Sequence, residues 1–153
     1  MPDIFISYAS EDRNRVAPIV AGLESAGYEV WWDRRIGIGA SFDREIERAI
    51  ENSRCVLVVW TQHAVESDWV RSEAQEGLNR NILVPVLLDD IAVPLAFRRT
   101  QTADLVGWRE SSEELYGVYE AVGRIVGRDA EEAPRSASKP ANGDRVQQEK
   151  MIW

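Results

Sequence analysis

The sequence predicts an α/β fold of three layers, in which helices cover both faces of a central, mostly parallel sheet of five strands. Strand-like and helix-like segments alternate along the chain, and this order favours parallel strands joined by helical crossovers. The segment Cys55–Trp60 is apolar without alternation, as expected of a central strand that is covered on both faces. Together the two observations favour layered helices and sheet over a helical bundle or a β-sandwich.

The N-terminal part predicts a strand, a helix and a second strand. The strands are expected at Ile4–Tyr8 and Tyr28–Trp32. Between them, apolar residues recur at the spacing of one helix face: Val16, Ile19, Val20 and Leu23. Ser10 is a suitable N-cap and Gly27 a suitable stop. Because Pro18 lies inside this helix, we expect either a kink or a start later than Ser10.

The middle of the chain predicts two more helices around the central strand, and then a fourth strand. Ser41 is expected to cap a helix whose inner face carries Phe42, Ile46, Ala49 and Ile50. Ser67 is expected to cap the next helix, which runs from about Asp68 to Arg80. The fourth strand is expected at Ile82–Leu88, although Pro85 is unfavourable inside a strand.

The C-terminal part completes the sheet and then changes in composition. Residues 89–101 fit a loop or an irregular helix, and residues 103–106 fit a short last strand. The final helix is lined by Leu115, Tyr119, Val122 and Val126. After Arg128 the chain becomes rich in Ala, Pro, Ser, Lys and Asn, which is typical of a linker or disordered tail. We therefore expect one domain over residues 1–128 and a tail over residues 129–153.

Composition and charge restrict the partners that the chain can have. It has 153 residues and a net charge of −8, so it lacks the basic face that nucleic acid binding requires. Its apolar runs have the length of strands and fall far below the roughly 20 residues of a membrane span. The start, Met1-Pro2-Asp3, leads directly into a strand without a signal peptide. With a single cysteine, Cys55, inside a strand, these features predict a cytoplasmic protein without disulfides, a metal site or a membrane partner.

A carboxylate, Glu73, is expected where open parallel sheets bind ligands. Residues 33–42 and 67–73 each follow a strand-like run and lead into a helix, which places them outside the carboxyl ends of the strands. On its helix, Glu73 faces Trp69, Val70, Glu76 and Gly77, and none of these is basic. Glu76, in contrast, has Arg80 four residues later. Glu73 is therefore a candidate catalytic residue, and the alternative is a solvated glutamate or one paired with another helix.

The chemistry open to one carboxylate at this edge includes sugar chemistry. A carboxylate can stabilise an oxocarbenium-like centre, or hold ribose hydroxyls, while an N-glycosidic bond breaks. A cationic nicotinamide leaves as a neutral molecule, so this reaction does not require a second acid. The helix alone does not select this reaction.

Three other signals fit ordinary structural roles better than functional ones. Gly37 and Gly39 follow a strand, but Phe42 stands where a dinucleotide-binding loop needs its third glycine. Asp89-Asp90 is expected to be a solvated turn. His63 is expected to be an ordinary loop histidine, with proton transfer as the alternative.

Several short segments, in order along the chain, resemble the signature boxes of TIR (Toll/interleukin-1 receptor) domains of the bacterial type. Residues 3–10 resemble the first box, and Trp32-Asp33 with Ile36–Gly39 resembles the BB loop. Residues 67–73 are similar to the segment that carries the catalytic glutamate of TIR enzymes that cleave NAD⁺. Val84-Pro85-Val86 and Gly107-Trp108 also fit, so the resemblance covers about residues 2–127.

This resemblance implies a flavodoxin-like fold and, as in many bacterial and plant members, hydrolysis or cyclisation of NAD⁺, which is the substrate and requires no separate cofactor. By position, Glu73 would be the catalytic carboxylate, and Tyr8 and Ala9 would border the nicotinamide and its ribose. Trp69 would line the site and orient Glu73. The loop over the cleft would be shaped by Asp33, Ile36, Gly39, Ser41 and Phe42.

The resemblance also implies other TIR domains as partners, because neighbouring domains commonly complete the active sites of this family. Ile36 and Ile38, beside Arg34 and Arg35, suit such a contact. We therefore expect an NAD⁺ nucleohydrolase or cyclase that is activated by self-assembly, in bacterial antiphage defence or signalling. The alternative is a non-catalytic TIR adaptor or effector that binds other TIR domains through the BB loop.

Overall fold

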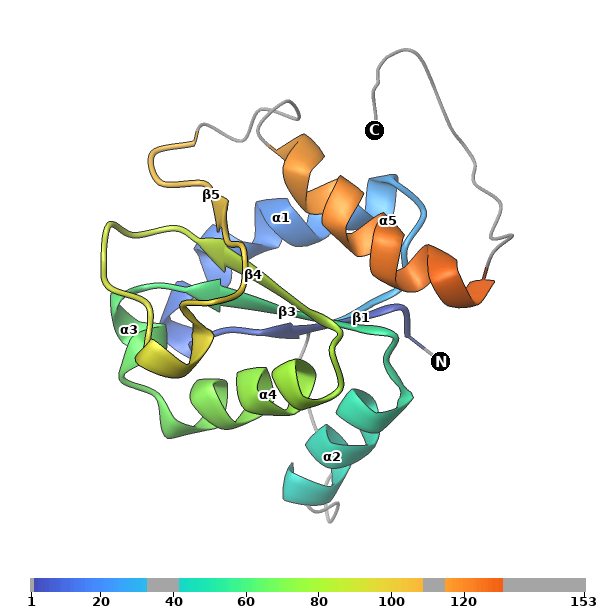
Figure 1. Cartoon of the computed structure of the whole chain (residues 1–153), viewed down its shortest axis with the longest axis horizontal. Helices are drawn as coiled ribbons and strands as arrows, with labels where there is room; N and C mark the ends of the chain where they lie inside the picture. Colours follow the sequence, from blue (N-terminus) through green and yellow to red (C-terminus); the bar gives the residue numbers. More distant parts are fainter. Residues whose placement is uncertain (1, 33–41, 109–114, 131–153) are drawn as a thin grey trace.

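The computed structural model describes residues 2–32, 42–108 and 115–130, which form three layers around a parallel sheet (Figure 1). The strands lie in the order β2-β1-β3-β4-β5, and every neighbouring pair is parallel. Their bounds are β1 Ile4–Ser7, β2 Val30–Trp31, β3 Cys55–Trp60, β4 Leu83–Leu87 and β5 Ala103–Asp104. The predicted fold class is thus confirmed.

Helices cover both faces of this sheet, with α1 and α5 on one face and α2 and α4 on the other (Figure 1). The helices are α1 Arg13–Ser25, α2 Phe42–Asn52, α3 Gln62–Val65, α4 Asp68–Asn79 and α5 Tyr116–Ala130. Two short 3-10 turns, η1 Ser10–Asp12 and η2 Leu95–Phe97, lie in the connections. Within the described ranges, no helix combines the length and the apolar character that crossing a bilayer would require.

The observed elements differ from the predicted ones mainly at the edges of the sheet. The outer strands β2 and β5 each have two residues, and such short edge strands leave few unpaired backbone groups open to another chain. The first helix starts at Arg13 rather than Ser10, in line with the later start that Pro18 indicates. The short helix α3 was not expected. It forms because the Thr61 side chain accepts a hydrogen bond from the Ala64 backbone N–H at 3.0 Å.

Two apolar clusters fill the space between the sheet and its two helical layers. Strand β1 contributes to both, since successive side chains of a strand point to opposite faces. Ile4 and Ile6 belong to the cluster under α1 and α5, whereas Phe5 belongs to the cluster under α2 and α4. Cys55 is fully buried in the first cluster, and burial raises the pKa of its thiol to about 12. The interpretation of Cys55 as a core residue is therefore confirmed.

Helix α4 packs closely on the sheet because residue 77 is glycine. A Cβ atom at Gly77 would lie 2.8 Å from Cβ of Val56 in β3, which is closer than side chains approach one another. Since Glu73 precedes Gly77 by about one helical turn, this close approach also sets the distance between Glu73 and the sheet.

Candidate active site

Glu73 lies on the face of α4 that packs against the sheet. The helix begins as predicted, with the Ser67 side chain accepting a hydrogen bond from the Val70 backbone N–H at 3.2 Å. Val70, Ala74 and Gly77 are buried on this face, and Glu73 is buried with them at 2% exposure. A carboxylate at such a depth must have polar partners, because taking an isolated charge out of water is costly.

One partner of Glu73 is Ser7, the last residue of β1. The Ser7 hydroxyl donates a hydrogen bond to Oε1 of Glu73 at 2.7 Å, and the Ser7 side chain is fully buried. The alternation of β1 places Ser7 on the same face of the sheet as Phe5, which is the face that α4 covers. The contact therefore joins the carboxylate on α4 directly to the carboxyl end of β1.

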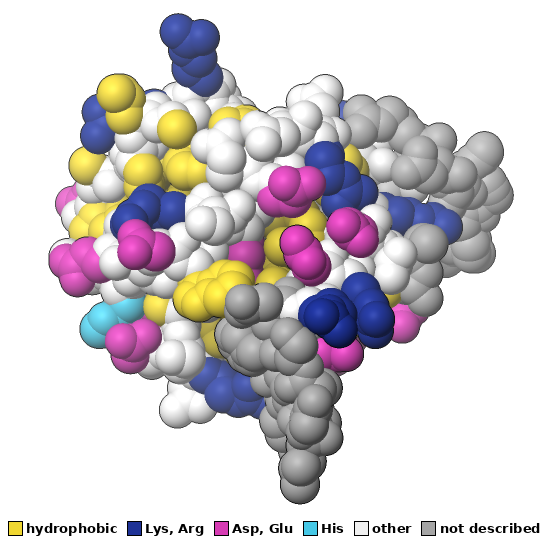
Figure 2. Space-filling view, turned by 90° about the horizontal axis from the view of Figure 1, so that it is seen from below, with side chains coloured by type: hydrophobic (Ala, Val, Ile, Leu, Met, Phe, Trp, Pro, Cys, Tyr) yellow, Lys and Arg dark blue, Asp and Glu magenta, His cyan; other side chains and the backbone are white. Residues whose placement is uncertain are grey.

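Beside Glu73, a cleft of about 420 Å³ opens between α2 and α4. Its lining consists of carboxylates, apolar side chains and one serine: Ile46, Glu47, Ile50, Glu51, Trp69, Ser72, Glu73 and Glu76. Figure 2 shows this face, where acidic side chains surround a patch of hydrophobic surface. Trp69 is 46% exposed at the cleft, so its indole is accessible to a ligand.

The charge of this cleft is negative. Among the residues that the structure describes, the lining contains four glutamates and no basic side chain. Arg80, which the spacing paired with Glu76, instead donates hydrogen bonds to the backbone oxygens of Ile50 and Ser53. Arg71 likewise contacts Asp68 and the backbone oxygen of Val65. A cleft that combines carboxylates with an exposed indole favours a cationic, planar ligand group.

Tyr8 and Ala9, the two predicted contacts after β1, are divided between the two faces of the sheet. Ala9 is buried in the apolar cluster on the Glu73 side. Tyr8 is buried in the opposite cluster, where its ring packs against Trp32 and its hydroxyl donates a hydrogen bond to the Trp32 backbone oxygen at 2.9 Å. The structure thus brings Ala9, Trp69 and Glu73 to one side, and the Tyr8 side chain to the other.

The remaining predicted site residues fall in the loop before α2. Asp33, Ile36, Ile38, Gly39 and Ser41 lie outside the described residues. Phe42 opens α2, but its side chain lies outside the described part of the chain. Their predicted roles at the cleft stay predictions.

Sequence reasoning missed three polar residues of this site. Glu47 and Glu51 lie on α2, and nothing in the sequence places this helix beside α4. Ser7 could have been found from the sequence, because it lies two residues after Phe5 and therefore on the same face of a strand whose residues are all buried. A hydroxyl at such a position predicts a buried polar partner.

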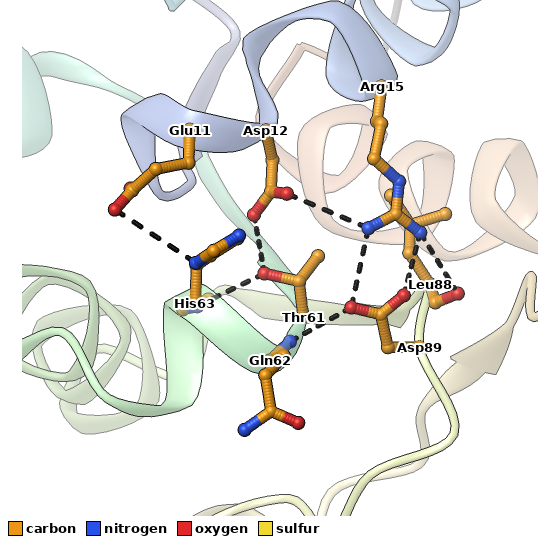
Figure 3. Close-up of polar contacts among 9 residues, drawn as sticks. Glu11, Asp12, Arg15, Thr61, Gln62, His63, Leu88 and Asp89 are labelled. Carbon is orange, nitrogen blue, oxygen red and sulfur yellow. Dashed lines mark hydrogen bonds and ion pairs between the residues drawn. The ribbon is translucent and has the colours of Figure 1, made fainter.

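A second polar cluster lies at the carboxyl ends of β3 and β4 and around η1 (Figure 3). The Thr61 hydroxyl donates a hydrogen bond to buried Asp12 at 2.5 Å, and Arg15 lies 3.6 Å from the same carboxylate. Arg15 also pairs with Asp89 at 2.8 Å, and its guanidinium lowers the pKa of the Asp89 carboxyl. Asp89 therefore belongs to a largely solvated ion-pair network, which the prediction of a simple solvated turn did not include.

His63 lies at the rim of the same cluster, within α3 rather than in a loop. Its Nδ1 atom is 4.0 Å from a carboxylate oxygen of Glu11, and both side chains are more than half exposed. This solvated pair lies outside the cleft that contains Glu73. The cluster as a whole joins positive and negative groups and has the character of a structural network.

Another hollow, of about 600 Å³, lies on the opposite side of the sheet between α1 and α5. The described residues of its lining, among them Pro18, Trp108 and Tyr119, include no carboxylate, lysine, arginine or histidine. The described part of the chain also has no group of three His, Cys, Asp or Glu side chains placed to hold a metal ion. The acidic cleft is therefore the stronger candidate for a reaction at a sugar.

Comparison with known proteins identifies the family. The sequence profile of the TIR domain matches residues 4–117, which is most of the chain. The chain belongs to the TIR domain family. Its structure is similar to the crystal structure of the TIR domain of the Toll-related receptor TRR-2 from Hydra magnipapillata, with a TM-score of 0.68 and 27% identity. The similarity covers 82% of this chain and 98% of the Hydra domain.

Relatives of this TIR domain include proteins named for chemistry on NAD⁺. It is 33% identical over 91 residues to the NAD(+) hydrolase PdTIR of Paracoccus denitrificans. This match covers 55% of this chain and 30% of the relative. It is 34% identical over 73 residues to the probable 2′ cyclic ADP-D-ribose synthase TcpB of Brucella melitensis. This match covers 46% of this chain and 29% of that protein. The matches thus span less than a third of either relative.

Proposed function

We propose that this TIR domain cleaves NAD⁺ at the bond between nicotinamide and ribose, and that Glu73 is the catalytic carboxylate. The observation that carries the proposal is a buried, hydrogen-bonded glutamate in an acidic cleft with an exposed tryptophan. The names of the relatives support the same substrate, since NAD⁺ hydrolysis and cyclic ADP-ribose synthesis begin with the same bond.

The cleft fits the charge changes of this reaction. In NAD⁺ the pyridinium ring is cationic, and it leaves as neutral nicotinamide with the electron pair of the N-glycosidic bond. Positive charge then develops on the ribosyl carbon, where a nearby carboxylate stabilises it. The exposed indole of Trp69 offers a face for the planar ring, and Glu47, Glu51 and Glu76 add negative charge around it.

The product depends on what attacks the ribosyl carbon. Water adds its oxygen to this carbon and releases one proton, which yields ADP-ribose. A hydroxyl of the substrate itself instead yields a cyclic product, also with release of one proton. We propose hydrolysis or cyclisation without preference, because the two kinds of relative are about equally similar to this chain.

The wider setting is also part of the proposal. We infer that the domain acts in the cytoplasm, in bacterial antiphage defence or signalling, and that it becomes active when TIR domains assemble through Ile36 and Ile38. Membership of the TIR family supports assembly, although these two residues lie outside the described part of the chain. A non-catalytic adaptor that uses the same loop is the competing hypothesis.

The test is NAD⁺ consumption with product identification, at high protein concentration and with a crowding agent. Wild type, Glu73→Ala and Glu120→Ala are compared, since Glu120 is an exposed glutamate of α5 on the other side of the sheet. We expect wild type and Glu120→Ala to release nicotinamide and Glu73→Ala to release none. If all three leave NAD⁺ intact while wild type binds other TIR domains, the adaptor hypothesis replaces the enzyme.

A further inference from the structure

A serine ends a strand whose other residues are all apolar. Ile4, Phe5, Ile6 and Ser7 form β1, and each is fully buried. An unpaired hydroxyl at such a site is unfavourable, because burial removes it from water without a compensating hydrogen bond. A partner for the Ser7 hydroxyl is therefore expected, and it is the Glu73 carboxylate rather than a neutral group.

The Ser7 hydroxyl is placed by the sheet and not by a loop. Ser7 lies opposite Val58 in the parallel pairing of β1 with β3, and β1 is an inner strand with β2 on its other side. Groups that sit on regular, paired elements hold a reactive geometry better than groups on loops. The position of Oγ relative to α4 is consequently rigid.

The single hydroxyl hydrogen of Ser7 has two acceptors within reach. Glu73 Oε1 lies 2.7 Å from Oγ, whereas the Val70 backbone oxygen lies 3.5 Å away. A separation of 2.7 Å is typical of a hydrogen bond from a hydroxyl to an ionised carboxylate, and 3.5 Å is at the outer limit for any hydrogen bond. The hydrogen is therefore directed to Glu73.

The surroundings of Glu73 make such a donor useful for orientation. Among the described residues, Glu76 of α4 and Glu47 and Glu51 of α2 line the same cleft, and like charges repel the Glu73 carboxylate. A hydrogen bond from a buried hydroxyl fixes one carboxylate oxygen at the end of β1 and so limits the rotation of the Glu73 side chain.

We propose that Ser7 is a positioning residue that holds the Glu73 carboxylate in the orientation seen beside the cleft. Ser7 is fully buried and so does not touch a substrate; it acts through Glu73. The proposal rests on the function proposed above for Glu73. It adds that the Ser7–Glu73 hydrogen bond keeps the carboxylate in the geometry that the transition state requires.

The test compares Ser7→Ala with Ser7→Cys, which keeps a weak donor, and with Ser53→Ala. Ser53 is a matched control, because it is also buried, and its hydroxyl donates to the Ala49 backbone oxygen at 2.6 Å, away from the cleft. Nicotinamide release is measured over a range of NAD⁺ concentrations, so that kcat and KM are obtained separately.

For Ser7→Ala we expect kcat to fall about tenfold with little change in KM, because the carboxylate is misplaced in the transition state while substrate binding is retained. Ser7→Cys should give a smaller fall in kcat, and Ser53→Ala none. An unchanged kcat in Ser7→Ala, or an equal fall in Ser53→Ala, would overturn the proposal.

A second measurement separates this proposal from the proposed function. In protein with ¹³C-labelled glutamate, the Glu73 carboxyl signal is assigned by its loss in Glu73→Gln and is recorded without NAD⁺. We expect its chemical shift to change in Ser7→Ala, or in Ser7→Cys if Ser7→Ala does not fold, and to stay the same in Ser53→Ala. A wild type that leaves NAD⁺ intact defeats the proposed function alone, whereas an unchanged chemical shift defeats the role of Ser7 alone.

Discussion

In the part of the chain that the structure describes, two carboxylates are buried, each with a buried hydroxyl partner, and they have opposite surroundings. Glu73 accepts a hydrogen bond from Ser7 at 2.7 Å, and Asp12 accepts one from Thr61 at 2.5 Å. Both carboxylates are nearly inaccessible, with exposures of 2% and 3%. Burial and a hydroxyl donor therefore do not distinguish a candidate catalytic acid from a structural one.

The neighbouring charges do distinguish them. Asp12 lies 3.6 Å from Arg15, which also pairs with Asp89, so this side of the molecule compensates its negative charge locally. Glu73 borders a cleft whose described lining has three more glutamates and no basic side chain. A compensated carboxylate holds the fold together, whereas a carboxylate in an acidic cleft is suited to a cationic ligand.

The largest expected effect comes from removing each negative charge while keeping its shape. Glu73→Gln should lower NAD⁺ cleavage by at least about 10²–10³-fold, because the developing positive charge loses its counter-charge. Asp12→Asn should retain cleavage and lose stability instead. Nicotinamide release at equal concentration of folded protein checks both variants. A similar loss of activity in the two would erase the distinction between them.

Removing the hydroxyl of the structural pair should mainly affect stability. Thr61→Val takes a donor from buried Asp12 and the cap from α3, which should cost about 2–4 kcal/mol of unfolding free energy. Thr102→Val is the control, since the Thr102 hydroxyl bonds only partly buried backbone, at 3.2 Å to the Thr100 oxygen. Urea denaturation measures the unfolding free energy of both variants. Equal losses of unfolding free energy would show that the Thr61–Asp12 hydrogen bond contributes no more than the Thr102 one.

The packing behind Glu73 gives the next prediction. Gly77→Ala should destabilise the protein by about 1–3 kcal/mol, because the new methyl group meets Cβ of Val56 in an inner strand. It should also lower NAD⁺ cleavage, since α4 moves away from Ser7. Gly117→Ala is the matched control in α5, where nothing lies within 4 Å, and it should be neutral or stabilising. A stable, fully active Gly77→Ala would contradict the close packing of α4.

The smallest effect concerns acid stability of the network around Asp12. Arg15 lowers the pKa of Asp89, so this pair contributes stability fully above about pH 4, and the contribution is lost as the pH falls through the lowered pKa. Because the pair is largely solvated, Asp89→Asn should cost less than about 1 kcal/mol near pH 7. Unfolding curves of wild type and variant should converge in acid. A difference that stays constant with pH would show that the charge of Asp89 is not responsible.

Local patterns predicted much of this fold. The continuous apolar run of β3, the caps at Ser67 and Gly27, and the helical spacing of Val16 to Leu23 each depend on residues close together in the sequence. The lengths of the edge strands β2 and β5 were harder to predict, because they depend on how far each strand pairs with its single neighbour. Helix α3 was missed because its length of four residues leaves no periodic signal.

The sequence by itself determined the layered α/β fold, the position of Glu73 on a helix after the central strand, and the overall negative charge. These follow from periodicity and composition, which are local or additive properties. Only the tertiary structure decided that Ser7 meets Glu73 across 66 residues, that Tyr8 turns away from it, and that glutamates of α2 join those of α4 in one cleft. Contacts of this kind depend on how separate elements pack, and side-chain spacing along one element does not contain that information.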